Sequence, residues 1–255
     1  MMDVKPKKHL GQHFLIDEKI SERISNAISK SNKINLLEIG PGTGALTKFL
    51  LHENIDLISY ELDDESITYL KNTFPTLVVY NEDILKTDWT KIFKGNYYVT
   101  GNFPYNISSQ ILFKIYENRT IIDQMVGMFQ KEVAERVCSG PGTKKYGILS
   151  VLIQAYYDVE YLFTVNEEVF NPPPKVKSGV IKITRNNIIK LDCDEKLFFR
   201  VVKAIFNQRR KMARNSLKSL LGDEKIDHVL LTKRPEELSI ENFTEITKMI
   251  ESKIN

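Results

Sequence analysis

A short apolar run that passes directly into a glycine-rich turn restricts the fold of this chain more than any other feature. Residues 35–39 read Asn-Leu-Leu-Glu-Ile, and residues 40–47 read Gly-Pro-Gly-Thr-Gly-Ala-Leu-Thr. Glycines allow a tight turn and a close approach of the backbone to a ligand, and the N-terminus of the following helix offers unpaired N–H donors. The pattern predicts a strand, turn and helix that bind a nucleoside cofactor beside Gly40 and Gly42.

Three later apolar runs each predict a strand that ends in polar residues. These strands cover residues 55–61, 77–80 and 97–100. Glu61, Asp83 and Asn102 lie at or just after their carboxyl ends, and in an open parallel sheet those ends form the ligand-binding edge. We expect Glu61 to accept hydrogen bonds from ribose hydroxyls and Asp83 to accept one from the amine of an adenine. Taken singly, such a carboxylate also fits a solvated charge at the end of a strand.

The remaining pattern completes an α/β fold and then changes. Further strands are predicted over residues 125–129, 161–165 and 179–184, with helical spacing between several of the strands. After residue 185 the spacing is helical throughout, and one helix is expected over residues 194–221. We therefore predict a Rossmann-like sheet with helices on both faces over residues 1–185, and a small all-α domain over residues 186–255.

Glu38 narrows the choice of cofactor. It immediately precedes Ile39 and the glycine turn. A carboxylate at that place repels a pyrophosphate and attracts an ammonium or sulfonium group. The position favours S-adenosylmethionine over a dinucleotide.

Residues 102–105, Asn-Phe-Pro-Tyr, end the predicted fourth strand and suit the methylation of a planar amine. The lone pair of an exocyclic amine is delocalised into its ring, so the nitrogen must become tetrahedral before it attacks a methyl group. The Asn102 side-chain oxygen and the carbonyl of Phe103 or Pro104 can accept its two N–H bonds, and Pro104 stiffens the loop. Tyr105 can stack on the base. A turn with a buried tyrosine would also fit these four residues.

Phe170 is the second aromatic candidate for the site. It opens the run Phe-Asn-Pro-Pro-Pro-Lys-Val over residues 170–176, whose three prolines are rigid. We expect it near the strand ends, opposite Tyr105 across a bound base. A place in the core fits the sequence equally well.

A basic segment without acidic residues extends from Arg200 to Lys218 and holds seven cations. A solvated helix face normally mixes both charges, whereas a phosphate-binding face does not. The predicted RNA contacts are Arg209, Arg210, Lys211 and Arg214.

Composition limits the cellular setting. The chain of 255 residues has a formal net charge of +3, and its two cysteines, Cys138 and Cys193, lack the spacing of a zinc or redox pair. We expect no metal site. The first fifteen residues lack an apolar core of signal-peptide length, and no apolar run reaches 18 residues. A cytoplasmic protein without a membrane segment is expected.

Together the motifs resemble those of the ribosomal RNA adenine N6,N6-dimethyltransferases, most closely of the members that modify 16S rRNA. The resemblance covers nearly the whole chain. The glycine turn occurs in many methyltransferases, so the segments 170–176 and 206–211 are the ones specific to this family. The matching segments are residues 11–15, 38–44, 61, 83, 102–108, 130–132, 170–176 and 206–211.

The resemblance implies an S-adenosylmethionine-dependent enzyme that dimethylates two adjacent adenosines in a hairpin near the 3′ end of 16S rRNA, in the immature small ribosomal subunit. A monomer is expected. Asn102 and Tyr105 would hold the base, with Phe170 opposite. By motif, the cofactor residues would be His13, Leu15, Gly40, Glu61, Asp83 and Asn102.

Two residues depart from the family pattern. His13 stands where asparagine is commoner, which puts its contact in doubt, although a histidine can still donate or accept a hydrogen bond. Phe103 replaces a leucine or isoleucine, but only its backbone carbonyl enters the chemistry.

Three alternatives stay open at this point. An enzyme that dimethylates one adenosine of 23S rRNA shares the fold and the site, but residues 172–176 and 206–210 argue against it. A ribosome-assembly or transcription factor without catalysis would not need the intact segments 38–44 and 102–105. A glutamine methyltransferase would not need the basic segment.

Overall fold

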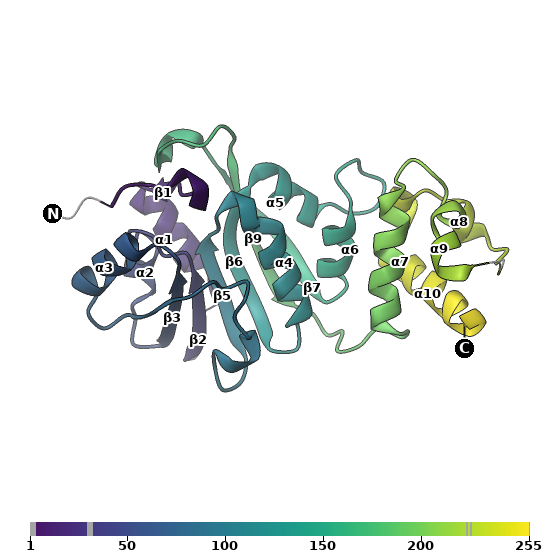
Figure 1. Cartoon of the computed structure of the whole chain (residues 1–255), viewed down its shortest axis with the longest axis horizontal. Helices are drawn as coiled ribbons and strands as arrows, with labels where there is room; N and C mark the ends of the chain where they lie inside the picture. Colours follow the sequence, from purple (N-terminus) through teal and green to yellow (C-terminus); the bar gives the residue numbers. More distant parts are fainter. Residues whose placement is uncertain (1–3, 30–32, 223, 225, 255) are drawn as a thin grey trace. The chain divides into compact units, whose positions relative to one another are not determined.

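The chain forms two compact units. The computed structural model (Figure 1) describes residues 4–29, 33–222, 224 and 226–254. The first unit comprises Met1–Ala134 and Val159–Arg185, and the second comprises Glu135–Asp158 and Asn186–Asn255. The chain leaves the first unit for the last time after Arg185, the position of the predicted domain boundary. Residues 135–158, predicted as part of the first domain, belong to the second unit. The division of labour between a catalytic and an RNA-binding domain stays a prediction.

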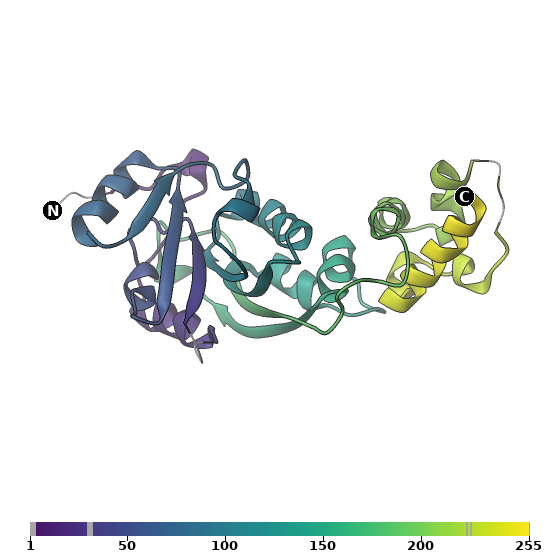
Figure 2. The ribbon, with the colours of Figure 1, turned by 90° about the horizontal axis from the view of Figure 1, so that it is seen from below.

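A seven-stranded mixed sheet forms the first unit, with helices on both faces (Figure 2). The strand order is β4-β3-β2-β5-β6-β9-β7; β9 runs antiparallel to β6, and the pairs from β4 to β6 are parallel. The strands are β2 (Ile34–Ile39), β3 (Ile55–Glu61), β4 (Val78–Asn81), β5 (Tyr97–Asn102), β6 (Ile122–Gln130), β7 (Tyr157–Val165) and β9 (Ser178–Arg185). The α/β fold predicted from the sequence is therefore confirmed.

The central strands are apolar because both faces of the sheet are covered. Leu36 and Leu37 point to opposite faces of β2, and both are fully buried. Asp17 caps the first helix by accepting a hydrogen bond from the Lys19 amide, as its type predicts. The helices along this part of the chain are α1 (Glu18–Ala27), α2 (Thr47–Leu50), α3 (Asp64–Thr73), α4 (Ser108–Glu117) and α5 (Lys131–Cys138).

The order of the strands places a ligand crevice between β2 and β5. From β2 the chain continues to β3 and β4 on one side, and then returns to place β5 and β6 on the other. The helices after β2 and β5 consequently leave the sheet in different directions. Such a switch point opens a crevice at the carboxyl ends of the strands.

A second, two-stranded sheet joins two segments that are far apart in the sequence. β1 (Phe14–Leu15) pairs antiparallel with β8 (Phe170–Asn171), with Phe14 opposite Asn171 and Leu15 opposite Phe170. Two of the motifs singled out in the sequence are thus in direct contact. We call residues 7–16 the N-terminal strap.

The second unit is built from helices around an aromatic core. Phe206 lies between Tyr146 and Phe243, with ring centroids 5.8 and 5.7 Å away. The apolar face expected on α7 is confirmed, because its Phe198, Val202 and Ile205 are buried. The helices along this part of the chain are α6 (Ile148–Gln154), α7 (Glu195–Asn207), α8 (Ala213–Ser216), α9 (Lys218–Leu221) and α10 (Ile240–Ile254).

The single helix predicted over residues 194–221 was wrong. Helix α7 ends at Asn207, and residues 208–211 form a turn and a bend before α8 begins at Ala213. The Ala213 amide then donates to the Lys233 carbonyl, so a bond to another part of the unit replaces the helical one. Arg200 and Lys203 therefore lie on α7, while the basic residues from Arg209 to Lys218 occupy a turn and two short helices.

In residues 4–29, 33–222, 224 and 226–254, no helix is both long and apolar enough to cross a membrane. Within the same ranges, no three His, Cys, Asp or Glu side chains are grouped so that they could hold a metal ion.

Candidate active site

A pocket opens at the carboxyl ends of β2, β3 and β5, in the crevice that the strand order creates. The glycine turn, the N-terminal strap and the loop after β5 form its walls. Almost all the predicted cofactor and catalytic residues meet in it. Those that line it are His13, Leu15, Glu38, Gly40, Gly42, Glu61, Asp83, Asn102, Pro104 and Tyr105.

The glycine turn brings backbone to the floor of the pocket. Gly40 and Gly42 have φ values of 68° and 57°, which residues with a side chain rarely adopt. A Cβ on Gly42 would lie 2.9 Å from the Phe14 ring, so the N-terminal strap packs directly on the turn. The lack of a side chain at position 42 therefore serves both the bend and the contact.

Glu61 is held by three backbone amides. Its Oε2 accepts from Gly42 at 3.0 Å, and its Oε1 accepts from Leu62 and Asp63 at 2.8 and 3.0 Å. Burial raises the pKa of Glu61 in spite of these hydrogen bonds. Each carboxylate oxygen can accept two hydrogen bonds, so Oε2 retains one place for a ligand hydroxyl.

Glu38 is the most deeply buried carboxylate of the pocket, with 1% of its surface exposed. Its Oε2 accepts hydrogen bonds from the Thr47 and Ser59 hydroxyls at 2.8 and 3.2 Å. Burial raises its pKa to about 7 against the effect of these bonds, and the nearby charge of Glu61 adds to the rise. A cation in the pocket would reverse this effect by stabilising the ionised form.

Asp83 lies on the wall that extends from β4. Its Oδ1 accepts from the Leu85 amide at 3.0 Å, and its Oδ2 lies 3.5 Å from the Lys86 ammonium. The half-exposed side chain of Leu62 also lines the pocket. A flat ring could therefore find both an apolar surface and an acceptor on this side.

The Asn102 amide is oriented by the N-terminal strap. Its Nδ2 donates to the His13 carbonyl at 2.9 Å. No hydrogen bond engages Asn102 Oδ1 among the described residues, and Asn102 lines the pocket. Its role as the acceptor for a substrate amine stays a prediction.

The two backbone carbonyls that the sequence offered as alternatives, those of Phe103 and Pro104, differ in their hydrogen bonds. The Pro104 carbonyl accepts from the Ile107 amide at 3.1 Å and from the Ser108 hydroxyl at 3.2 Å. The Phe103 carbonyl has no recorded donor among the described residues. Phe103 therefore carries the carbonyl that is available to a substrate.

The Tyr105 ring is fixed at its hydroxyl and beside one edge. Its hydroxyl shares a hydrogen bond of 2.5 Å with Ser178 on β9. The His13 ring lies 5.5 Å away at an interplanar angle of 31°, and His13 Nδ1 donates to the Pro172 carbonyl at 2.7 Å. His13 thus supports Tyr105, a contact that the sequence did not indicate.

Phe170 is buried in this structure. Its side chain is 2% exposed and belongs to the hydrophobic core with Leu15 and Val180, and it is not among the residues that line the pocket. Its cross-strand partner Leu15 belongs to the same core and also lines the pocket. The burial of Phe170 supports the alternative of a core residue, and an aromatic face opposite Tyr105 stays a prediction.

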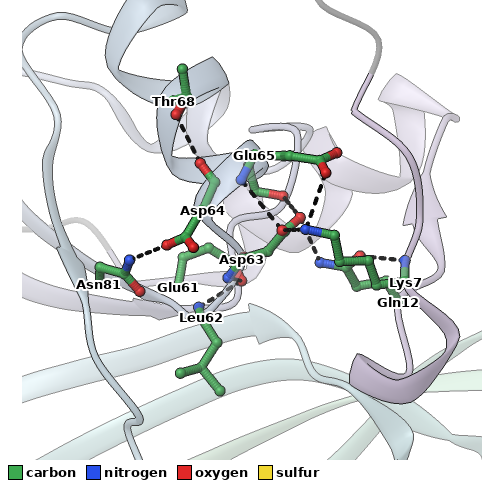
Figure 3. A network of polar contacts seen from close by, with 10 residues as sticks. Lys7, Gln12, Glu61, Leu62, Asp63, Asp64, Glu65, Thr68 and Asn81 are labelled. Atoms are coloured by element: carbon green, nitrogen blue, oxygen red, sulfur yellow. Dashed lines mark hydrogen bonds and ion pairs between the residues drawn. The ribbon is translucent and has the colours of Figure 1, made fainter.

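The N-terminal strap is bound to Asp63, two residues after Glu61, the predicted ribose-binding residue. The sequence did not indicate this attachment. Figure 3 shows Lys7 and Gln12 pointing toward Asp63, the buried N-cap of α3. The Lys7 ammonium contacts Asp63 and lies 3.3 Å from Glu65, and Gln12 donates to Asp63 at 3.3 Å. The residue type of Asp63 before a helix indicates an N-cap. Its partners Lys7 and Gln12 could not be predicted, because they lie in a distant segment of the sequence.

The basic residues lie in the second unit. The Arg209 guanidinium donates to the Thr143 carbonyl at 3.2 Å, and Arg210, Lys211 and Arg214 are exposed. The charged groups of these exposed residues thus face solvent on one turn and the short helix that follows it.

Comparison with known proteins indicates the same family along almost the entire chain. The family described as "Ribosomal RNA adenine dimethylase" matches residues 4–252. The "Ribosomal RNA small subunit methyltransferase A" of Parabacteroides distasonis is 57% identical over 248 residues, which are 96% of this chain and 93% of the relative. Its counterpart from Bacteroides thetaiotaomicron is 53% identical over 253 residues, covering 97% and 95%.

Two solved structures share the fold. A dimethyladenosine transferase from Plasmodium falciparum superposes with a TM-score of 0.78 at 25% identity, covering 94% of this chain and 98% of that one. The 23S rRNA methyltransferase ErmE superposes with a TM-score of 0.69 at 23% identity, covering 92% and 99%. The second likeness concerns the fold alone.

The raised pKa of Glu38 predicts a pH-dependent stability. Its pKa is about 7 in the folded protein against 4.5 ordinarily, so between these values the folded protein keeps a proton that the unfolded chain has lost. The free energy of unfolding should fall as pH rises through this window, and Glu38→Gln should remove about 3 kcal/mol of that fall. Urea unfolding followed by the fluorescence of the buried Trp89, at pH 4.5 and 7.5, measures it. Glu65→Gln, at an exposed site, should change nothing.

Asp63→Asn should loosen the N-terminal strap, because it removes the charge that holds Lys7. Trypsin should then cleave after Lys7 or Lys8 several-fold faster, and S-adenosylhomocysteine should bind more weakly in calorimetry. Glu65→Gln serves as the control, since its contact with Lys7 is exposed and contributes little. Equal cleavage rates for Asp63→Asn and the wild type would show that this ion pair does not hold the strap.

Proposed function

The chain belongs to the ribosomal RNA adenine dimethylase family, and from this membership we infer that it is an S-adenosylmethionine-dependent methyltransferase of small-subunit rRNA. We propose that it dimethylates N6 of two adjacent adenosines in a hairpin near the 3′ end of 16S rRNA, within the immature small subunit. The observation that carries the proposal is that Asn102 lines the pocket and donates from its Nδ2 to the His13 carbonyl, which supports Oδ1 as the acceptor offered to a substrate. Without that acceptor the pocket would hold a cofactor but no reacting amine.

The residues of the pocket fit S-adenosylmethionine. The cofactor carries two cationic groups, and Glu38 and Glu61 are buried carboxylates whose raised pKa values a cation would lower. Glu61 Oε2 retains an acceptor place for a ribose hydroxyl, and Asp83 can accept from the adenine amine. When bound, the cofactor supplies an electrophilic methyl group.

The catalytic contribution of the chain is position and hydrogen-bond acceptance. Asn102 Oδ1 and the Phe103 carbonyl would accept the two N–H bonds of the adenine amine and favour a tetrahedral nitrogen with an available lone pair. An amide and a carbonyl are weak bases, which suits a reaction whose proton leaves only after the methyl group has arrived. Pro104 restricts the loop, so both acceptors are placed in advance.

Tyr105 would provide the surface on which the base stacks. Its hydrogen bond to Ser178 and its contact with His13 hold the ring before substrate arrives. Because Tyr105 lines the pocket and Phe170 is buried in the core, we assign base stacking first to Tyr105, and a second face from Phe170 stays a prediction.

We further propose that the basic segment binds rRNA phosphates. Arg210, Lys211 and Arg214 are exposed, and no acidic residue interrupts the segment from Arg200 to Lys218. Cations grouped in this way release counterions when they bind a nucleic acid, which yields affinity that depends on salt. An rRNA substrate implies action in the cytoplasm, and a monomer suffices because one chain supplies all the pocket residues.

Asn102→Ala should abolish methyl transfer and leave RNA binding nearly intact, because it removes an acceptor used only at the reacting nitrogen. Immature small subunits, labelled cofactor and mapping of the modified base measure the activity, and filter binding measures the affinity for RNA. Asn96→Ala, at an exposed asparagine outside the pocket, is the matched control. Near-normal incorporation by Asn102→Ala would refute the role.

Replacing Arg209, Arg210 and Arg214 by alanine should weaken RNA binding and flatten its dependence on salt. The slope of log K against log salt should fall by about 0.7–0.9 for each phosphate contact that is lost. Lys248→Ala and Lys253→Ala, on α10 of the same unit, control for the lower net charge. If the triple variant retains the wild-type slope, the basic segment does not contact the RNA.

A further inference from the structure

The Phe103 side chain occupies a slot between two glycines of neighbouring strands. Gly101 on β5 and Gly127 on β6 are direct partners across the parallel pair, so both would direct a side chain to the same face of the sheet. The Phe103 ring fills the space that those two side chains would take, and Phe103 is 1% exposed. The Phe129 ring, with its centroid 4.8 Å away, also contacts it.

The slot leaves no room for a methyl group at position 127. A Cβ there would lie 2.1 Å from Cε2, 2.9 Å from Cζ and 3.0 Å from Cδ2 of Phe103. Contacts under 3.0 Å do not occur between real atoms of this kind, so the ring would have to move. It is packed on several sides, and its movement would pull on its own backbone.

That backbone carries the acceptor of the active site. The Phe103 amide donates to the Met128 carbonyl at 3.1 Å, and Met128 directly follows Gly127. One residue thus has its amide bound to β6 and its ring held in the slot, while it lines the pocket and no donor among the described residues engages its carbonyl. The position of the carbonyl depends on both attachments.

We propose that Gly127 is a positioning residue for methyl transfer, acting through Phe103. By lacking a side chain it admits the ring that sets the Phe103 carbonyl against the amine of the base. The inference rests on the proposed function, because it concerns the acceptor that this reaction uses. It extends the site to a residue that touches neither substrate nor cofactor.

A purely structural role for Gly127 makes a different prediction. If the glycine served only to pack the core, an alanine would lower the stability of the first unit and leave the rate per folded molecule unchanged. A positioning role lowers the rate at saturating cofactor and RNA, because the acceptor is displaced in the transition state. It leaves the affinity for S-adenosylhomocysteine nearly unchanged.

The experiment compares Gly127→Ala, Phe103→Leu and the double variant in single-turnover methylation of immature small subunits. Leucine has no atom at the place of Cε2, the phenylalanine atom that a Cβ at 127 would meet first. Gly127→Ala should lower the rate by about tenfold to a hundredfold, the cost expected for an acceptor displaced by up to about 1 Å. The double variant should recover to about the rate of Phe103→Leu alone, a non-additivity that a double-mutant cycle measures.

Two further glycines provide controls. A Cβ on Gly101 would lie 2.6 Å from the Ile39 carbonyl oxygen, a backbone atom that a change at 103 cannot move aside, so Gly101→Ala should not be rescued by Phe103→Leu. Gly140→Ala, with no atom within 4 Å of the added Cβ, should match the wild type. Thermal unfolding and calorimetry with S-adenosylhomocysteine verify that each variant is folded and binds the cofactor product.

The outcomes separate the two hypotheses. If the wild type fails to methylate any small subunit, the proposed function is wrong. If the wild type is active and Gly127→Ala is equally active, or if Phe103→Leu restores nothing to a folded Gly127→Ala protein, the positioning role is overturned. A loss of rate that leucine at 103 reverses supports it.

Discussion

The hydrogen bond from the Asn102 amide to the His13 carbonyl is the interaction on which the rest of the site depends. It joins the end of β5 to the N-terminal strap and engages the nitrogen of the amide, so that we expect the oxygen to be the atom offered to a substrate. A rotated amide would present a donor to an amine that already carries two hydrogens, and the two would repel. The strap is itself held at Asp63 and at β8, so the orientation of one side chain rests on contacts from three parts of the first unit.

The burial of two carboxylates determines the charge of the pocket. Glu38 and Glu61 are removed from water and kept close to neutral hydroxyls and amides, which leaves their charge only partly compensated. A ligand with one or two positive charges would gain affinity from these two carboxylates. A phosphate group would be repelled by them. We therefore expect selection among nucleoside cofactors to arise at the carboxylates, while the glycine turn supplies shape.

Local patterns were sufficient to predict the sheet and the pocket residues that end its strands. Glu61, Asp83 and Asn102 follow directly from apolar runs, because parallel strands bring their carboxyl ends to one edge whatever the loops do. Contacts between distant segments were not predictable. Phe170 is buried where β8 pairs with β1, and after α7 ends at Asn207 the Ala213 amide bonds to the Lys233 carbonyl instead of continuing a helix. The local sequence around Phe170 and Ala213 does not indicate either of these contacts. For the same reason, the packing of the Phe103 ring against Gly127 could be recognised only from the structure.

The pairing of β1 with β8 also bears on the order of events during synthesis. The strap is translated before its partner at Phe170–Asn171, which follows all the strands from β2 to β7. A nascent chain that holds the glycine turn and the acidic strand ends still lacks the strand against which β1 pairs. A chain interrupted before residue 170 would carry these pocket residues with β1 left unpaired.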